Sequence, residues 1–108
     1  MSEKIYTIEQ IKNIVSPIAQ KHKIPKVYLF GSYARGDADG KSDIDIRIDA
    51  ENLRSLFDLG LLYSDLEDAF GKSLDIVTTE ALRERLSDPL TRRFVRNMKK
   101  DECLIYEE

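Results

Sequence analysis

The chain has 108 residues, of which 42% are apolar and 34% are charged, and its formal net charge is -3 at pH 7. This length accommodates one compact domain, predicted over residues 1–108, and the negative charge gives no electrostatic reason to bind a nucleic acid backbone. One cysteine cannot form an internal disulfide, and no apolar run approaches the ~20 residues of a membrane span. The first residues carry no signal-peptide pattern, so we expect a cytoplasmic protein.

Hydrophobic periodicity and capping residues predict alternating helices and short strands. The predicted elements are a helix over 7–22, a strand over 26–30, a short helix over 32–36, a loop over 37–42, a strand over 43–49, a helix over 53–70, a strand over 73–77, a helix capped by Thr79 that runs to about Leu86, a helix that starts at Pro89, and a strand over 102–106. This order predicts an α/β or α+β fold in which helices flank one small mixed sheet.

The predicted strand over 43–49 alternates strictly between isoleucine and charged residues. Ile44, Ile46 and Ile48 belong to one face, and the charged side chains belong to the other. Asp43 and Asp45 are two residues apart, so their Cα atoms are expected to lie roughly 6 to 7 Å apart with both carboxylates on one face. Two adjacent anions favour a cation between them, and Mg²⁺ prefers such oxygen ligands. The pattern therefore predicts a metal site for phosphoryl chemistry, with two ions as the expected number.

Gly31 and Ser32 directly follow the preceding predicted strand. Glycine lets the backbone approach a phosphate closely, and a helix start offers free amides to an anion. Arg35 lies one turn further along. It either contacts a phosphate or pairs with Asp37 or Asp39.

The segments GSYARG and SDIDIRID together resemble the signature of the minimal nucleotidyltransferases of the DNA polymerase beta superfamily. In that signature a glycine and a serine follow the first strand, and a pair of aspartates lies on the second. A third carboxylate of the family lies on a neighbouring strand, and the resemblance assigns it to Asp75 in SLDIVT.

The resemblance implies transfer of a nucleoside monophosphate from a triphosphate, expected to be ATP, to an acceptor hydroxyl. Asp43 and Asp45 would bind two Mg²⁺ ions, Asp75 would bind the catalytic ion and act as general base, and Gly31 and Ser32 would hold the triphosphate. Small members of the family resemble antitoxins that adenylylate a tyrosine of a HEPN ribonuclease toxin, so a protein partner is expected.

Two other functions remain open at this point. The chain could instead be a non-catalytic, nucleotide-binding antitoxin that masks its partner. Alternatively it modifies a small molecule of the aminoglycoside type, with a second subunit completing the acceptor pocket. Homo- or hetero-oligomers are compatible with each function.

Arg47 departs from the family pattern, in which this position is often apolar. It shares the face of the aspartates, where it would neutralise charge, contact a substrate, or pair with Asp45 or Asp49. A basic excess between Arg83 and Lys100 is either a solvated helix face or a docking surface for an acidic partner or the acceptor. For His22 we expect a role at a helix C-terminus, and for Cys103 a buried thiol.

Overall fold

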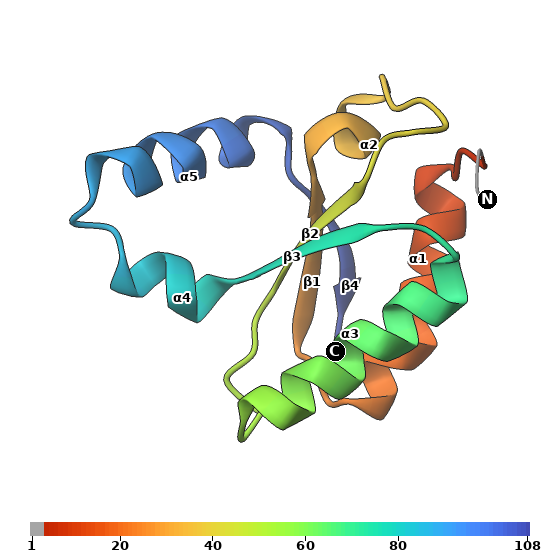
Figure 1. Ribbon diagram of the computed structural model, residues 1–108, viewed down its shortest axis with the longest axis horizontal. Coiled ribbons are helices and arrows are strands. Elements are labelled where there is room, and N and C mark those ends of the chain that lie inside the picture. Colours follow the sequence, from red (N-terminus) through yellow and green to blue (C-terminus); the bar gives the residue numbers. More distant parts are fainter. Residues whose placement is uncertain (1–3) are drawn as a thin grey trace.

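The computed structural model describes residues 4–108 and shows a four-stranded sheet with helices around it (Figure 1). Residues 1–3 lie outside the described residues, and they belong to the N-terminal segment in which we expect no signal peptide. The elements are α1 (Ile8–Lys21), β1 (Lys26–Phe30), α2 (Gly31–Arg35), β2 (Ile44–Ile48), α3 (Leu56–Phe70), β3 (Leu74–Thr78), α4 (Thr79–Glu84), α5 (Pro89–Asp101) and β4 (Cys103–Glu107). Within residues 4–108, no helix is long and apolar enough to cross a membrane.

The sheet has the strand order β3-β2-β1-β4. β1 runs antiparallel to both β2 and β4, whereas β2 and β3 are parallel. The predicted mixed α/β class is therefore confirmed. The long helix α3 makes the crossover between β2 and β3 that a parallel pair requires.

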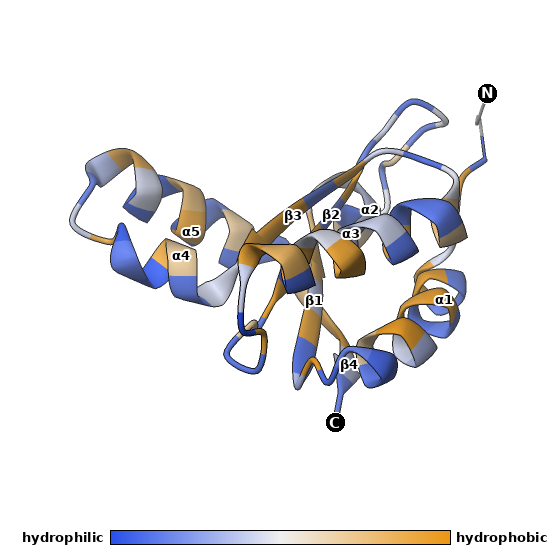
Figure 2. Cartoon of the chain, turned by 60° about the horizontal axis from the view of Figure 1, so that its bottom comes forward, coloured by the Kyte–Doolittle hydropathy of each residue, from blue (hydrophilic) through white to orange (hydrophobic). Residues whose placement is uncertain are grey.

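One face of the sheet forms the core with α1 and α3 (Figure 2). Ile46 on β2 pairs with Leu29 on β1, and neither residue is exposed to solvent. The strands are largely orange in Figure 2, and the helices carry both colours, as amphipathic elements do. Because side chains alternate along a strand, the charged residues of β2 belong to the opposite face.

Caps set the boundaries of several helices. The predicted capping box of α1 is confirmed, since Thr7 accepts a hydrogen bond from the backbone of Gln10 and the Gln10 side chain accepts one from Thr7. α3 begins at Leu56 rather than at residue 53, because Ser55 accepts a hydrogen bond from the Asp58 amide and caps the helix there.

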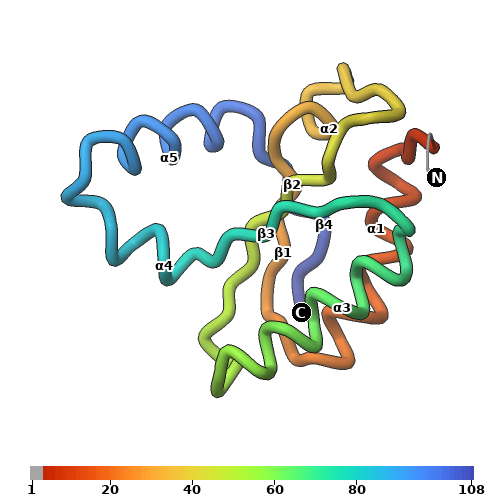
Figure 3. Tube along the Cα trace, viewed as in Figure 1, coloured from red at the N-terminus to blue at the C-terminus, as the bar shows by residue number. Residues whose placement is uncertain are grey.

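The α4–α5 arm, residues 79–101, leaves the end of β3 and returns to β4 (Figures 1 and 3). Thr78 caps α4, so the predicted cap at Thr79 is wrong by one residue. Asp88 caps α5, and Pro89 occupies its first turn as predicted, because the missing amide costs nothing there. The arm extends to the side of the sheet away from α1 (Figure 1).

Replacing Leu62 with alanine is expected to lower the free energy of unfolding by about 3 kcal/mol. Leu62 is 1% exposed in the core, whereas Leu56 on the same helix is 85% exposed. The same substitution at Leu56 should change stability by less than about 0.5 kcal/mol. Urea unfolding of the two variants measures the difference, and equal effects would contradict the described packing of α3.

Candidate active site

The register of the parallel strands brings two of the predicted aspartates together. Asp45 on β2 lies directly opposite Asp75 on β3. Both are flanked by apolar residues, and Ile44 and Ile46 on either side of Asp45 are fully buried on the other face. The two carboxylates therefore share the sheet face that α1 and α3 leave uncovered.

Asp43 lies just outside β2, which begins at Ile44, so the predicted strand over 43–49 is one residue too long at each end. Asp43 is exposed, and its negative charge acts on Asp45. Within residues 4–108, no group of three or more His, Cys, Asp or Glu side chains is already arranged to hold a metal ion. The structure thus pairs Asp45 with Asp75, and a ligand role for all three aspartates stays a prediction.

The carboxylate of Asp45 is in an environment that favours its protonated form. Burial, the hydrogen bond with Asp75 and the charges of Asp75 and Asp43 raise the pKa of Asp45 from 3.8 to about 6, and Arg35 opposes this shift. A bound cation relieves the repulsion between these neighbouring carboxylates, and carboxylate oxygens are ligands that Mg²⁺ prefers. The donor set therefore fits a divalent metal ion.

Replacing Asp45 with asparagine is expected to stabilise the metal-free protein at pH 8 but not near pH 4. Because the folded-state pKa is raised to about 6, the folded chain retains a proton that the unfolded chain loses above about pH 4. The free energy of unfolding therefore falls as the pH rises from about 4 to about 6. After allowance for solvent screening, the variant should gain on the order of 1–2 kcal/mol at pH 8. Urea unfolding in EDTA at both pH values tests this, and an equal gain at both would contradict it.

Gly31 lies against Asp45 and has a conformation that favours glycine. Its φ is 74°, and a Cβ placed on it would overlap Oδ2 of Asp45 and lie 3.1 Å from Cγ. α2 begins at Gly31, and no side chain caps this start. Backbone amides and a carboxylate pair thus meet at one point, which is an arrangement suited to a phosphate bound through a cation.

Ser32 is half-buried in the first turn of α2, beside this point. Its carbonyl accepts hydrogen bonds from the amides of Gly36 and Asp37, which closes the short helix. In the part of the chain that the structure describes, its hydroxyl has no protein partner among the hydrogen bonds. Contact between this hydroxyl and a triphosphate stays a prediction.

Arg35 pairs with carboxylates of two elements. Its Nε lies 3.2 Å from Asp37, as one of the sequence interpretations predicted, and its NH1 lies 3.2 Å from Asp101 at the end of α5. A cavity of about 200 Å³, here called the Gly31 hollow, is lined by Gly31, Arg35, Asp101 and Phe94 among others. Contact between Arg35 and a phosphate stays a prediction.

Arg47 is buried and pairs with Glu102 rather than with Asp45 or Asp49. Its NH2 lies 3.2 Å from the Glu102 carboxylate, its NH1 donates to Thr79, and its guanidinium stacks 3.9 Å from the Tyr28 ring centroid. Asp49 is connected to this cluster because it accepts a hydrogen bond from Thr79. Arg47 therefore joins the sheet to both ends of the α4–α5 arm.

Replacing Arg47 with methionine is expected to lower the free energy of unfolding by about 3 kcal/mol, because the half-buried Glu102 would lose its partner. The exposed Arg54 provides a matched control, and Arg54→Met should change stability by less than about 0.5 kcal/mol. Thermal and urea unfolding measure both. If Arg47→Met is no more harmful than Arg54→Met, the buried ion pair does not hold the arm.

Known proteins resemble this chain in both sequence and fold. The model of the family described as "Polymerase beta, Nucleotidyltransferase" matches residues 9–107. The chain belongs to this family.

Relatives of this nucleotidyltransferase include proteins named for protein modification. This chain is 30% identical over 93 residues to the protein adenylyltransferase MntA of Thermococcus cleftensis, and the match covers 82% of this chain and 94% of that one. It is 38% identical over 81 residues to a provisionally assigned protein adenylyltransferase of Methanocaldococcus jannaschii, covering 75% and 87%. Its fold resembles a chain from the complex of a tri-AMPylated Shewanella oneidensis HEPN toxin with an MNT antitoxin, with a TM-score of 0.64, 17% identity, and coverage of 94% and 74%.

Lys72 supports segments next to the candidate site, a role that sequence reasoning missed. Its Nζ donates to the Tyr33 hydroxyl on α2 at 3.0 Å and to the carbonyl of Gly40 at 3.2 Å. It thereby fixes α2 and the loop that leads to Asp43. These partners lie 39 and 32 residues away in sequence, so no local pattern could have indicated them.

Two minor predictions need adjustment. His22 is the C-cap of α1 as expected, but it also lies 2.7 Å from Asp65 on α3 and so connects two helices. Cys103 is only half-buried at the start of the edge strand β4, so the expected buried thiol is wrong.

Proposed function

We propose that this nucleotidyltransferase transfers AMP from ATP to a hydroxyl of a HEPN toxin, with a tyrosine as the acceptor, and thereby acts as its antitoxin. The observation that carries the proposal is the Asp45–Asp75 carboxylate pair lying against Gly31. The names of the relatives, protein adenylyltransferase MntA and the MNT antitoxin, support the acceptor class.

The glycine, the serine and the three aspartates of the site each have a role in this reaction, and Arg35 would contact a phosphate of ATP. The backbone at Gly31 and the hydroxyl of Ser32 would hold the triphosphate, and Asp43, Asp45 and Asp75 would hold two Mg²⁺ ions. Bound Mg²⁺ would neutralise phosphate charge and stabilise the leaving oxygen. Asp75, on the exposed edge strand, would accept the proton of the acceptor hydroxyl. The acceptor oxygen forms a bond to the α-phosphorus of ATP as the bond to the β-phosphate breaks, so pyrophosphate leaves.

The proposal also covers the domain organisation, the cellular location and the assembly of the protein. We assign residues 1–108 to a single nucleotidyltransferase domain, and the expected location is the cytoplasm, because ATP is available there. In solution the nucleotidyltransferase would act in a hetero-oligomer with the toxin, since its own surface must receive a folded acceptor.

Position-specific labelling of ATP tests the reaction. The nucleotidyltransferase and Mg²⁺ are incubated with a HEPN protein as the candidate partner and with ATP that carries label at either the α- or the γ-phosphate. Adenylyl transfer predicts that the HEPN protein acquires the α-label, while the γ-label appears in pyrophosphate.

The other outcomes identify the alternatives. γ-Label on the protein would indicate phosphoryl transfer and contradict the proposal. Toxin inhibition without incorporation of either label would indicate an antitoxin that masks its partner. Label transfer to an aminoglycoside but not to the HEPN protein would indicate a small-molecule transferase.

A further inference from the structure

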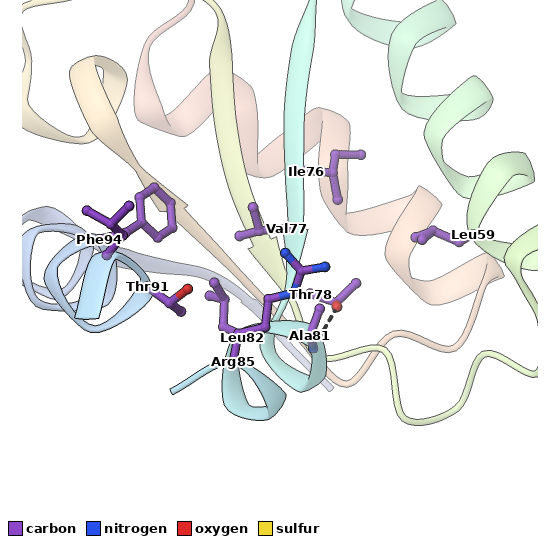
Figure 4. Close-up of a pocket in the computed structure, with 10 residues that line it drawn as sticks. Leu59, Ile76, Val77, Thr78, Ala81, Leu82, Arg85, Thr91 and Phe94 are labelled. Carbon is purple, nitrogen blue, oxygen red and sulfur yellow. Dashed lines mark hydrogen bonds between the residues drawn. The ribbon is translucent and has the colours of Figure 1, made fainter. Parts of the chain in front are cut away.

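A groove of about 480 Å³ lies between β3, the start of α3 and the α4–α5 arm (Figure 4). β3 is an edge strand that pairs with β2, so its other edge is open toward this groove. The groove has mainly apolar walls, formed by Leu59, Ile76, Leu82, Leu90 and Phe94. Figure 4 shows the Arg85 side chain reaching from α4 into the middle of these walls.

Large apolar side chains remain exposed on both sides of the groove. Leu90 is 74% exposed and Phe94 is 40% exposed on the arm. On the other side Leu56 is 85% exposed, one helical turn before Leu59. Apolar side chains gathered in this way commonly mark a surface for another protein.

The arm that forms one wall is strongly basic. Residues 79–101 carry seven cationic and four acidic side chains, a net charge of +3, although the whole chain has a net charge of -3. The cationic residues are Arg83, Arg85, Arg92, Arg93, Arg96, Lys99 and Lys100. Among the described residues, none of the ion pairs involves any of these seven side chains.

The groove lies next to the candidate catalytic residues. Ile76, Val77 and Thr78 line it, and they directly follow Asp75 on β3. Phe94 lines both the groove and the Gly31 hollow, where it contacts Phe30 edge to face with ring centroids 5.9 Å apart. A protein bound in the groove would therefore have a surface within reach of the proposed general base.

We propose that this groove docks an acidic amphipathic helix of the protein that receives the nucleotide, an inference that rests on the proposed function. Aliphatic side chains spaced three or four residues apart on that helix would enter between the start of α3 and the arm. Its flanking carboxylates would pair with Arg85 and the neighbouring arginines of the arm. Docking there places the acceptor hydroxyl beside Asp75.

The apolar walls favour a protein helix over a nucleic acid. Single-stranded nucleic acids are held by a basic channel with successive aromatic platforms, whereas Phe94 is the one aromatic among the described residues that line this groove. Arg85 beside aliphatic walls, on an arm with a net charge of +3, instead matches a helix with an apolar stripe and acidic flanks.

Substitutions that place a negative charge in the groove test this inference. The variants are Arg85→Glu and Leu90→Asp, and the matched control is Lys12→Glu on α1, across the molecule from the arm (Figure 1). Calorimetry measures binding to the candidate HEPN partner, and a fluorescent ATP analogue reports nucleotide binding. We expect each groove variant to weaken HEPN binding at least about tenfold, with nucleotide binding unchanged and the control within about twofold of wild type. Exchanging an acid on the partner helix for lysine should restore binding to Arg85→Glu.

Several results would overturn the inference. If both groove variants bind the HEPN protein as strongly as the wild type does, the docking inference is wrong, even if the wild type transfers AMP normally. If the chain alone forms a homodimer that Leu90→Asp dissociates, the groove binds a second copy of the chain. If the groove variants instead selectively lose binding to labelled single-stranded RNA, the groove binds nucleic acid. Groove-dependent HEPN binding without transfer of the α-label would uphold docking while refuting the proposed catalysis. Absence of HEPN binding by wild type would refute both.

Discussion

Replacing both Asp43 and Asp45 with asparagine is expected to reduce nucleotidyl transfer by at least about 1,000-fold while the fold is retained. Loss of a single group that stabilises the transition state costs about 10²–10³ in rate, and this variant loses two carboxylates of the proposed metal site. Asp43 is exposed and Asp45 is half-buried in a repulsive environment, so the folded state does not depend on their charges. Initial rates of pyrophosphate release in the presence of the acceptor measure the effect.

A control with the same change in charge separates catalysis from general electrostatics. Glu67 and Asp68 are exposed on α3, and replacing them with glutamine and asparagine also removes two negative charges. This control should retain activity within about twofold of wild type, as surface substitutions of this kind have small effects. Comparable activity of the two double variants would refute the assigned role of the aspartates.

Replacing Gly31 with alanine is expected to reduce transfer at least about 100-fold and to destabilise the protein by about 2–3 kcal/mol. The φ of 74° is unfavourable for alanine, and its Cβ would overlap the Asp45 carboxylate. Asp45 would have to move away from Asp75, so the carboxylate pair would be disrupted. Urea unfolding and transfer rates measure the two effects.

Two other glycines separate the causes of this effect. Gly36 has a φ of 87°, but a Cβ added to it would meet no atom within 4 Å, and Gly60 lies within α3 without either constraint. Gly36→Ala should therefore show only backbone strain, of about 1 kcal/mol, and Gly60→Ala should be neutral or slightly stabilising. If Gly31→Ala resembles Gly36→Ala in both measurements, contact with Asp45 is not what requires glycine at position 31.

The sequence was sufficient to predict the four strands and the buried face of β2. Strict alternation around Ile44, Ile46 and Ile48 identified the buried face of β2. A one-residue shift of the strand would turn all three isoleucines to the open face, so the pattern allows one orientation. The same alternation placed Asp45 on the open face. The cap at Thr7 and the first-turn position of Pro89 could be predicted because helix starts depend on neighbouring residues alone.

Contacts between distant segments could not be predicted from spacing. Asp75 faces Asp45 through the parallel register of β2 and β3, two strands that α3 separates in the sequence. Arg47 finds Glu102 at a distance of 55 residues in sequence, and both lie where the arm joins the sheet. The proposed docking groove likewise arises from four elements, α3, β3, α4 and α5, whose separate sequences show only apolar stripes and a basic helix.

The mass of the candidate HEPN partner after incubation with ATP and Mg²⁺ tests the central claim most directly. With the wild-type nucleotidyltransferase, intact-mass spectrometry should show addition of one or more adenylyl groups, fragmentation should locate them on tyrosine, and the ribonuclease activity of the toxin should fall in parallel. With the Asp43→Asn and Asp45→Asn double variant the mass should stay unchanged. An unmodified toxin that the wild type and the double variant inhibit equally well would contradict the account.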